Sequence, residues 1–405
     1  MRILIINAGS SSLKYQLMDA DTGAIEANGI AERIGINGSI IKYERPDKET
    51  EKRVIELPNH TVAMENVLEL LTSEEFGVLD SMDEIDAVGH RVLQGGEAFA
   101  GSYVIDDEVI EAIKLNIPLG PLHNPANLAG IMACRKAMPD KPQVAVFDTA
   151  FHASMPEHAF MYALPYHFYT DYRVRRYGFH GTSHQYVSEE AAKILDRDPK
   201  ELKIVTCHLG NGSSITAVDG GKSVDTSMGM TPLAGVPMGT RTGDLDPAIL
   251  KYLMELDLDE EDAFSIQDLD TIMNKQSGVL GISGVSSDFR DLAAAANEGN
   301  KRARLALKMF TYNVRKYIGA YAAAMGGLDC IVFTAGIGEN TSDVRAECVE
   351  GLEFLGAELD PARNEEFNHI GGEISKEGSR VKILIIPTNE ELAIARETAR
   401  LVEGA

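Results

Sequence analysis

The sequence has few cysteines, no excess of basic residues and no long hydrophobic run, and each shortage excludes a class of protein. The four cysteines lie far apart, form no CxxC pair and sit in apolar segments. They indicate buried thiols in a reducing compartment rather than disulfides or a metal site. No apolar stretch reaches the roughly 18 residues that a membrane helix requires. The N-terminus begins with a strand-like run and lacks the features of a secretory signal, so we expect a cytoplasmic protein.

The charge balance is strongly acidic. Lys and Arg total 38 and Asp and Glu total 62, which gives a net charge of −24 and a pI of about 4.8. Nucleic acids and anionic membranes are not expected as partners, because both require a basic surface. The 405 residues, 44% hydrophobic and 25% charged, are typical of a globular protein with two or three domains.

One pattern occurs twice, at the start of each half of the chain. Residues 3–14 form an apolar run, a Gly/Ser-rich turn and a second apolar run, and residues 204–216 repeat that order. Each copy predicts a hairpin of two strands. Further turns follow at 21–23 and 219–221. Such patterns also recur by chance, but their matching positions favour a duplicated α/β domain.

Helical and strand patterns alternate in the remaining segments. Apolar residues share one helical face within 61–71 and within 307–321. Residues 330–333 predict a strand, followed by a glycine loop at 334–340 and a helix. Residues 381–386 predict a strand before a C-terminal helix, where the capping-box spacing of Thr388 and Glu391 would place Glu390 in the first turn. The alternation is typical of α/β architecture.

Three familiar ligand motifs are incomplete. Residues 219–223 resemble the end of a P-loop, but position 216 is threonine where a glycine is required. The GxG at 336–338 lacks the third glycine of a dinucleotide fingerprint. His180 and His184 have the spacing of a zinc pair, but a glycine follows the first histidine where the zinc motif has a glutamate. These segments therefore do not support a P-loop, a dinucleotide site or a zinc site.

Polar residues gather instead at predicted turns, where folded proteins usually present their chemistry. The turn at 7–14 contains Asn7 and Lys14 beside a glycine that would let backbone N–H groups approach a phosphate. Glycine and polar segments also occur at 208–212, 288–290 and 336–340. Each segment alone could be a solvated turn, but three together favour one bound nucleotide.

Cationic and acidic residues follow other predicted strands. Arg91 follows an apolar strand, Arg241 lies in a glycine-containing segment, and His180 ends the basic run 173–180. Phosphoryl transfer needs mainly alignment and positive charge, and arginine can bind a carboxylate or phosphate through two hydrogen bonds. Each residue taken singly would more often be structural. Asp148 ends the strand 144–147, where it could orient a nucleophile, hold a metal or cap a helix.

Seven segments together resemble the acetate kinase family. They are 7–14 (NAGSSSLK), 121–127 (PLHNPAN), 146–152 (VFDTAFH), 176–184 (RYGFHGTSH), 238–246 (MGTRTGDLD), 333–340 (FTAGIGEN) and 387–391 (PTNEE). The resemblance implies duplicated actin and ribonuclease H-like α/β domains with an active-site cleft between them. Residues 1–150 with 385–405 would form the N-terminal domain, and residues 151–384 the nucleotide-binding domain.

The same resemblance implies the reaction and the partners. The chain would be a homodimeric phosphotransferase that transfers a phosphoryl group reversibly between ATP and acetate, giving acetyl phosphate and ADP. The reaction would depend on Mg²⁺, for which Mn²⁺ could substitute. Acetate is already a nucleophile at neutral pH, so we expect Asp148 mainly to position other groups or the metal.

The resemblance also assigns site residues by position. The expected metal ligands are Asn7 and Glu390, and the expected catalytic residues are Asp148, His180 and Arg241. Arg91 would bind the acetate carboxylate. The apolar wall around the methyl group would consist of Leu93, Leu122, Phe179 and Pro232. The nucleotide would be bound by Lys14, His208, Leu209, Gly210, Asn211, Gly212, Asp288, Phe289, Arg290, Gly336, Ile337, Gly338, Glu339 and Asn340.

Two positions depart from the family pattern. Leu93 stands where valine is usual, and Gln94 stands where histidine is usual. The extra methylene of Leu93 should crowd the pocket and strengthen discrimination against propionate. A propionate or butyrate kinase remains an alternative, and so does a nucleotide-driven binding module on the same scaffold, which would hydrolyse ATP slowly in response to a partner.

Overall fold

The structure is a computed structural model that describes residues 1–121, 123–256, 259 and 263–404. The chain forms two compact units. Unit 1 comprises Met1–Ala153 and Asn389–Ala405, and unit 2 comprises Ser154–Thr388. The C-terminal segment of the chain therefore belongs to the same unit as the N-terminus.

Unit 1 is built on one sheet, which has eight strands among the described residues, in the order β5-β4-β3-β2-β1-β6-β8-β7. Strands β1 to β5 form an antiparallel meander, whereas β6 and β8 extend the sheet in parallel with β1. The strands are β1 (Arg2–Gly9), β2 (Ser12–Asp19), β3 (Ile25–Glu32), β4 (Ile40–Glu44), β5 (Glu51–Val54), β6 (Ala87–Val92), β7 (Tyr103–Val104) and β8 (Gln143–Phe147).

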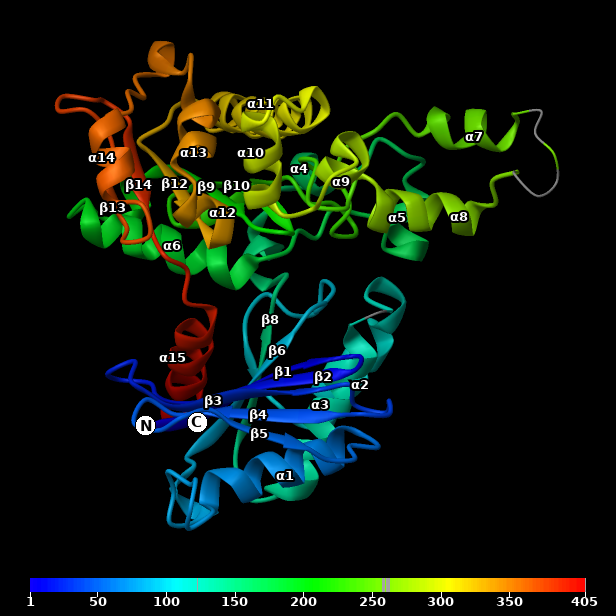
Figure 1. The fold of residues 1–405 in the computed structure, drawn as a ribbon, viewed down its shortest axis with the longest axis vertical. Helices are drawn as coiled ribbons and strands as arrows, with labels where there is room; N and C mark the ends of the chain where they lie inside the picture. The colour runs from blue at the N-terminus through cyan, green and yellow to red at the C-terminus, as the bar shows by residue number, and fades with distance from the viewer. Residues whose placement is uncertain (122, 257–258, 260–262, 405) are drawn as a thin grey trace. The chain divides into compact units, whose positions relative to one another are not determined.

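Helices cover both faces of this sheet (Figure 1). They are α1 (His60–Thr72), α2 (Asp107–Leu115), α3 (Asn124–Ala137) and α15 (Glu390–Glu403). Leu4 and Ile6 of β1 pack with α1 and α3 in one buried cluster. Helix α15 packs on the other face, where a Cβ added at Gly89 would lie only 2.7 Å from Ile394 Cγ2. Glycine at position 89 therefore lets α15 approach β6 closely.

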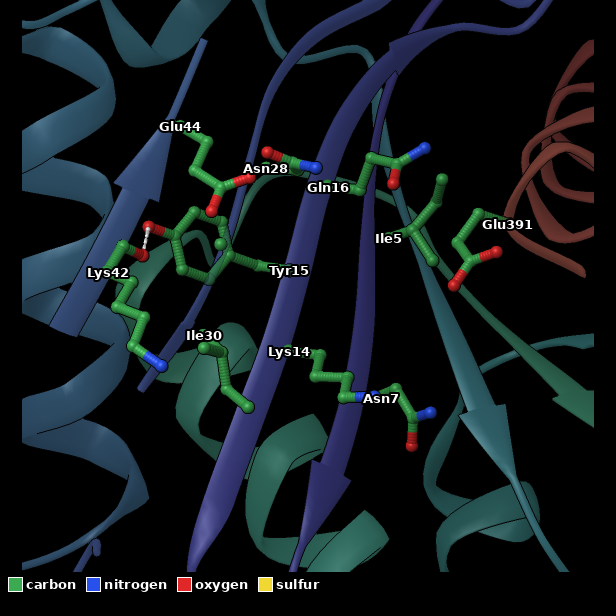
Figure 2. A pocket seen from close by; sticks show the side chains of 11 residues that line it. Ile5, Asn7, Lys14, Tyr15, Gln16, Asn28, Ile30, Lys42, Glu44 and Glu391 are labelled. Atoms are coloured by element: carbon green, nitrogen blue, oxygen red, sulfur yellow. Dashed lines mark hydrogen bonds between the residues drawn. The ribbon is translucent and has the colours of Figure 1, made fainter. Parts of the chain in front are cut away.

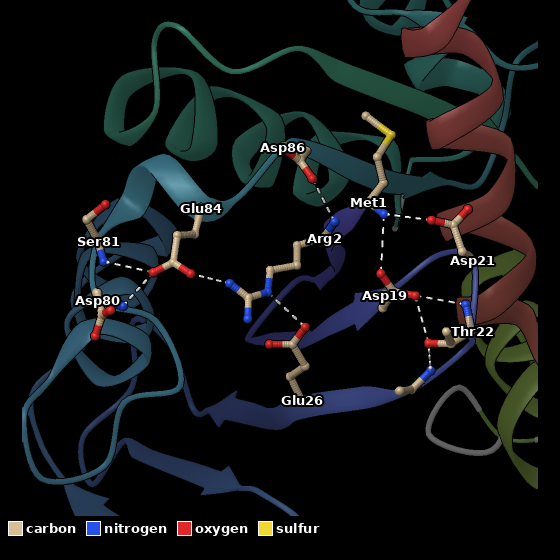
Figure 3. Close-up of polar contacts among 11 residues, drawn as sticks. Met1, Arg2, Asp19, Asp21, Thr22, Glu26, Asp80, Ser81, Glu84 and Asp86 are labelled. Carbon is tan, nitrogen blue, oxygen red and sulfur yellow. Dashed lines mark hydrogen bonds and ion pairs between the residues drawn. The ribbon is translucent and has the colours of Figure 1, made fainter.

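Ion pairs fix the start of β1 in unit 1 (Figure 3). Arg2 binds Glu26 over 3.0 Å and also pairs with Glu84. Its backbone N–H donates to Asp86 over 2.8 Å, and the N-terminal ammonium lies 3.2 Å from Asp19. These contacts tie β1 to β2, β3 and the segment before β6.

Unit 2 repeats the central strand order of unit 1. Its described sheet runs β11-β10-β9-β12-β14-β13, with β10 antiparallel to its neighbours and β12 parallel to both β9 and β14. The predicted hairpins are confirmed as β1/β2 and β9/β10, and the predicted duplicated α/β fold is confirmed. The strands are β9 (Lys203–Leu209), β10 (Ser213–Asp219), β11 (Lys222–Thr226), β12 (Cys330–Thr334), β13 (Gly372–Glu373) and β14 (Lys382–Ile385).

The core of unit 2 lies between its sheet and the long helix α11 (Lys301–Ala324), which contains the predicted apolar face. Phe310, Val314 and Ile318 of that face are fully buried. The other helices are α4 (Glu157–Phe160), α5 (His167–Tyr172), α6 (Gly181–Ile194), α7 (Ala248–Met254), α8 (Ile266–Thr271), α9 (Gly278–Ser283), α10 (Phe289–Asn297), α12 (Ala335–Asn340), α13 (Ser342–Val349) and α14 (Pro361–Glu366). No helix in the described ranges is long and apolar enough to cross a membrane.

Three local predictions were wrong. Residues 336–340 form helix α12 instead of a loop, because the Glu339 carboxylate accepts the backbone N–H of Ala335 over 2.7 Å and closes a helical turn. Residues 288–290 start α10, with Asp288 as its N-cap. Helix α15 is capped by Asn389, not by Thr388, whose N–H donates to Glu339 in unit 2.

Candidate functional site

The candidate site of unit 1 is a cluster of one arginine and two carboxylates. Arg91 is near the end of β6, Asp148 follows β8, and Glu390 is in the first turn of α15. Arg91 Nη2 donates to Asp148 Oδ2 over 3.0 Å, and Arg91 Nε lies 3.7 Å from Glu390 Oε2. Because β6 and β8 are parallel, their carboxyl ends meet at one edge of the sheet, where α/β proteins bind ligands.

Burial and the neighbouring charges shift the pKa values of Glu390 and Arg91 in this cluster. The Asp148 side chain is 1% exposed and that of Glu390 is 22% exposed. Burial, together with the charges of Asp148 and Glu391, raises the pKa of Glu390 to about 7, although Arg91 and Lys14 oppose the rise. The charge of Asp148 in turn raises the pKa of Arg91. The site therefore holds an arginine that is charged at any pH and a glutamate whose ionisation is costly unless another cation arrives.

The excess of carboxylates over cationic side chains at this site fits a divalent cation. Three carboxylates, those of Asp148, Glu390 and Glu391, share the site with two cationic side chains, Arg91 and Lys14. Mg²⁺ typically takes one or two carboxylates and completes its shell with waters and substrate phosphates. Among the described residues, no group of three or more His, Cys, Asp or Glu side chains could hold a metal by itself. A site centred on Glu390 offers the one or two carboxylates that Mg²⁺ typically takes.

A pocket of about 260 Å³ lies on the sheet face beside this cluster (Figure 2). Asn7 and Lys14 are direct cross-strand partners on β1 and β2, and both line the pocket together with Glu391. Lys14 is exposed and Asn7 is half-buried. The structure thus brings the first predicted turn and the start of α15 to one place in unit 1.

Buried amides hold the segment that follows Arg91. Asn127 Oδ1 accepts the backbone N–H of Leu93 over 3.0 Å, and Asn124 forms two hydrogen bonds with the backbone of Gln94. The Gln94 side-chain carbonyl accepts from Gly96 N over 2.9 Å. Leu93, the first residue after β6, is 8% exposed. Sequence reasoning gave Asn124 and Asn127 no role, although both lie in the quoted segment 121–127.

In unit 2, two polar side chains and the start of α12 converge on the turn between β9 and β10. A Cβ added at Gly212 would lie 3.6 Å from His180 Nε2 and 3.4 Å from Arg241 Nη1. Arg241 Nη1 also donates to the carbonyl oxygen of Pro232 over 3.1 Å, and burial lowers the pKa of Arg241. A Cβ added at Gly210 would lie 3.9 Å from that of Ala335, where α12 begins. The structure therefore brings His180, the 210–212 turn, Arg241 and the start of α12 together.

Backbone strain marks the same place. His180 and Ala335 have φ values of 58° and 63°, in the left-handed region that side chains other than glycine rarely adopt. His180 precedes the first residue of α6, and Ala335 begins α12. Such strain costs about 1 kcal/mol or more per residue and is concentrated at functional sites.

Arg345 of α13 hydrogen-bonds the backbone of α12 and was missed by sequence reasoning. It is fully buried, and Nη1 donates to the Gly338 carbonyl oxygen over 2.9 Å. Its other hydrogen bonds go to Asn364 and Asn368, and burial lowers its pKa to about 10. In the sequence, Arg345 could have been noticed only as an arginine among the apolar residues of a helical pattern.

The remaining predicted residues separate into three groups. His208 is buried, and its ring stacks on that of His180 with 4.1 Å between centroids. Leu209, Phe179 and Phe289 are also buried, and Phe289 packs against Phe310 in the core. Arg290 is exposed and pairs with Asp288, whose pKa this contact lowers to about 2. The prediction for Leu122 lies outside the described residues.

Comparison with known proteins gives matches along the whole chain. The sequence pattern of the Acetokinase family matches residues 2–396. An acetate kinase from Caldicellulosiruptor bescii is 56% identical and aligns with 99% of this chain and 100% of its own length. One from Caldanaerobacter subterraneus subsp. tengcongensis is 57% identical, with full coverage of both chains.

Solved structures agree with these sequence matches. The crystal structure of Porphyromonas gingivalis acetate kinase has a TM-score of 0.95 and 46% identity, with 99% of each chain covered. A propionate kinase from Francisella tularensis subsp. tularensis has a TM-score of 0.89 and 40% identity, also with 99% of each chain covered.

Proposed function

Because this chain belongs to the acetokinase family, we propose that it is an acetate kinase that transfers the terminal phosphoryl group of ATP to acetate. The observation that carries this proposal is the Arg91, Asp148 and Glu390 cluster at the carboxyl edge of the unit 1 sheet. A guanidinium beside a site for a cation supplies both charges that a carboxylate acceptor and a phosphate require.

In the proposed reaction, a carboxylate oxygen of acetate attacks the terminal phosphorus in line while the bond to the ADP oxygen breaks. Arg91 binds the acetate carboxylate, and the buried Asp148 holds Arg91 in place through the 3.0 Å hydrogen bond. Leu93 would contact the methyl group. Acetate needs no base, so Asp148 acts by position.

Unit 2 is proposed as the nucleotide-binding domain. The 208–212 and 336–340 segments would bind the nucleotide, and helix α10 at 288–290 would contribute through its backbone and Arg290. His180 Nε2 and Arg241 Nη1 face the same turn and would stabilise the negative charge of the transferring phosphoryl group. Their proximity within one unit supports this role.

Mg²⁺ is proposed as the metal, with Glu390 and Asn7 as its protein ligands. When bound, it would neutralise phosphate charge. Lys14, the cross-strand partner of Asn7, would bind a phosphate oxygen. A cytoplasmic location is proposed from the four buried free cysteines. We also propose a homodimer, for which exposed Tyr166, Tyr172 and Tyr252 offer apolar contact area; sedimentation would test it.

A hydroxamate assay with acetate, ATP and Mg²⁺ tests the reaction directly, because acetyl phosphate reacts with hydroxylamine. His180→Ala and Arg241→Ala should each lower kcat by about 100-fold or more, with the fold intact by circular dichroism. A series from acetate to butyrate separates acetate kinase from a propionate or butyrate kinase. Slow ATP hydrolysis without hydroxamate would instead indicate a nucleotide-driven binding module.

A further inference from the structure

We propose that Ser214, His184 and Thr206 are positioning residues that fix which ring nitrogen of His180 carries a proton. The inference rests on the proposed role of His180 in phosphoryl transfer. None of the three residues is among the predicted site residues, and all three are fully buried. Buried polar atoms depend on one another for hydrogen bonds, so their contacts constrain the rings tightly.

A continuous chain of hydrogen bonds joins His180 to these three residues. Ser214 Oγ lies 2.8 Å from His180 Nδ1 and 2.7 Å from His184 Nε2. The other nitrogen of His184, Nδ1, lies 2.7 Å from Thr206 Oγ1. Thr206 Oγ1 in turn donates to the carbonyl oxygen of Thr216 over 3.5 Å. The chain therefore begins at His180 and ends at a backbone carbonyl within the β9/β10 ladder.

The carbonyl gives the chain a direction, because a carbonyl oxygen can only accept. With the Thr206 hydroxyl donating to Thr216, the proton between Thr206 and His184 belongs to His184 Nδ1. Nε2 of His184 then accepts from the Ser214 hydroxyl, whose oxygen accepts from His180 Nδ1–H. Hydrogen positions are assigned here from these four contacts taken together. His180 therefore carries a proton on Nδ1 in both charge states, and Nε2 is the nitrogen that gains or loses one.

The His180 nitrogen that gains or loses a proton, Nε2, faces the turn between β9 and β10. Nε2 is on the side of the ring that faces Gly212 and Arg241. A proton on Nε2 produces a cation beside Arg241, where it can stabilise phosphoryl charge. The His208 ring stacks on the His180 ring with 4.1 Å between centroids, and Nδ1 of His208 bonds Ser183 Oγ over 2.8 Å.

The sheet offers a closely matched pair of variants. Thr206 and Thr216 are cross-strand partners, both fully buried, but the Thr216 hydroxyl bonds Thr226 over 2.8 Å instead of a histidine. Thr206→Val and Ser214→Ala should each lower kcat about tenfold or more, with the KM for ATP and acetate changed less than about threefold. Thr216→Val should leave both unchanged. Ser214→Thr retains the hydroxyl and should restore most of kcat.

A second measurement does not depend on activity. Nitrogen-15 NMR of histidine-labelled enzyme reports the tautomer of each ring, and His180→Gln assigns the His180 signals among the ten histidines. We expect the neutral His180 ring to be protonated at Nδ1 in the wild type and in Thr216→Val. In Ser214→Ala it should be a mixture of both tautomers.

The outcomes separate this inference from the proposed function. A neutral wild-type His180 protonated at Nε2 would overturn the inference without any variant being needed. Equal kcat losses in Thr206→Val and Thr216→Val would overturn it too, because they would show a merely structural effect. If no acetyl phosphate forms but His180 carries its proton on Nδ1 as expected, the proposed function fails and the hydrogen-bond chain stands.

Discussion

Arg91 and Asp148 form a hydrogen-bonded ion pair over 3.0 Å between a 24% exposed guanidinium and a 1% exposed carboxylate. The two residues are 57 positions apart and are brought together by the parallel strands β6 and β8. Breaking a largely buried pair is more costly than its net contribution suggests, because the remaining charge stays desolvated.

Arg91→Ala should therefore destabilise the protein as well as weaken acetate binding. Removing the arginine breaks its ion pair with the buried Asp148 carboxylate, and we expect a loss of about 3 kcal/mol in unfolding free energy. Adding Asp148→Asn should recover part of this loss. Urea unfolding at neutral pH measures the change, and additive losses in the double variant would show that the pair is not coupled.

Leu93→Val should relax discrimination between acetate and propionate. Leu93 is 8% exposed and anchored by its backbone N–H to Asn127, so the side chain cannot easily withdraw. One methylene in an apolar pocket changes specificity by about 1 to 3 kcal/mol at most. The ratio of kcat/KM for the two substrates measures it, and an unchanged ratio would remove Leu93 from the pocket.

Glu390→Gln should weaken metal binding and stabilise the metal-free protein at pH 8. The pKa of Glu390 in the folded chain is about 7, above its ordinary value of 4.5, so folding favours the protonated form. The contribution of Glu390 to the free energy of unfolding therefore decreases as the pH rises from 4.5 through 7. The expected gain is at most about 3 kcal/mol, because one pKa unit corresponds to about 1.4 kcal/mol.

Mn²⁺ binding followed by paramagnetic resonance measures the metal affinity of that variant. Glu391→Gln is the matched control, since Glu391 is in the same helical turn but exposed. Equal losses of Mn²⁺ affinity in both variants would indicate a general charge effect instead of a ligand at position 390.

His90 should make unit 1 less stable in mild acid. It is 2% exposed and its Nε2–H donates to Gln143 Oε1 over 2.8 Å. Burial lowers its pKa from 6.5 to about 4, so the folded chain binds fewer protons than the unfolded chain between these values. Stability is full above pH 6.5 and is lost as pH falls through 4, by up to about 3 kcal/mol.

His90→Gln should flatten that dependence, because glutamine can hydrogen-bond Gln143 but does not titrate. Urea midpoints between pH 7 and pH 4 measure the slope. The exposed His167→Gln provides the control and should retain the wild-type slope. A slope unchanged by His90→Gln would assign the acid sensitivity to other groups.

Local sequence patterns predicted the strands and hairpins well and the helix starts less well. The apolar runs at 3–14 and 204–216 gave both hairpins, because alternation and turn residues act over a few positions. The start of α12 was not predicted, because it depends on the Glu339 carboxylate accepting the backbone N–H of Ala335. A glycine-rich sequence gives no indication of that hydrogen bond. Thr388 was wrongly predicted to cap α15, because its hydrogen-bond partners, Ser183 and Glu339, are far away in the sequence.

The candidate site shows the same division. Family resemblance named Arg91, Asp148, His180 and Arg241 from their motifs. It gave no role to Ser214, which bonds both His180 and His184, or to Asn127, which holds the backbone of Leu93, since these residues act through contacts across strands and helices.

The order of apolar, glycine and charged residues along the chain was enough to determine a duplicated α/β architecture and the chemical groups available to it. Tertiary structure alone decided the environment of each group: which carboxylate is buried beside Arg91, which hydroxyl bridges two histidines, and which arginine supports α12. Secondary structure follows from short-range spacing, whereas pKa values and hydrogen-bond direction depend on desolvation and on partners many residues away.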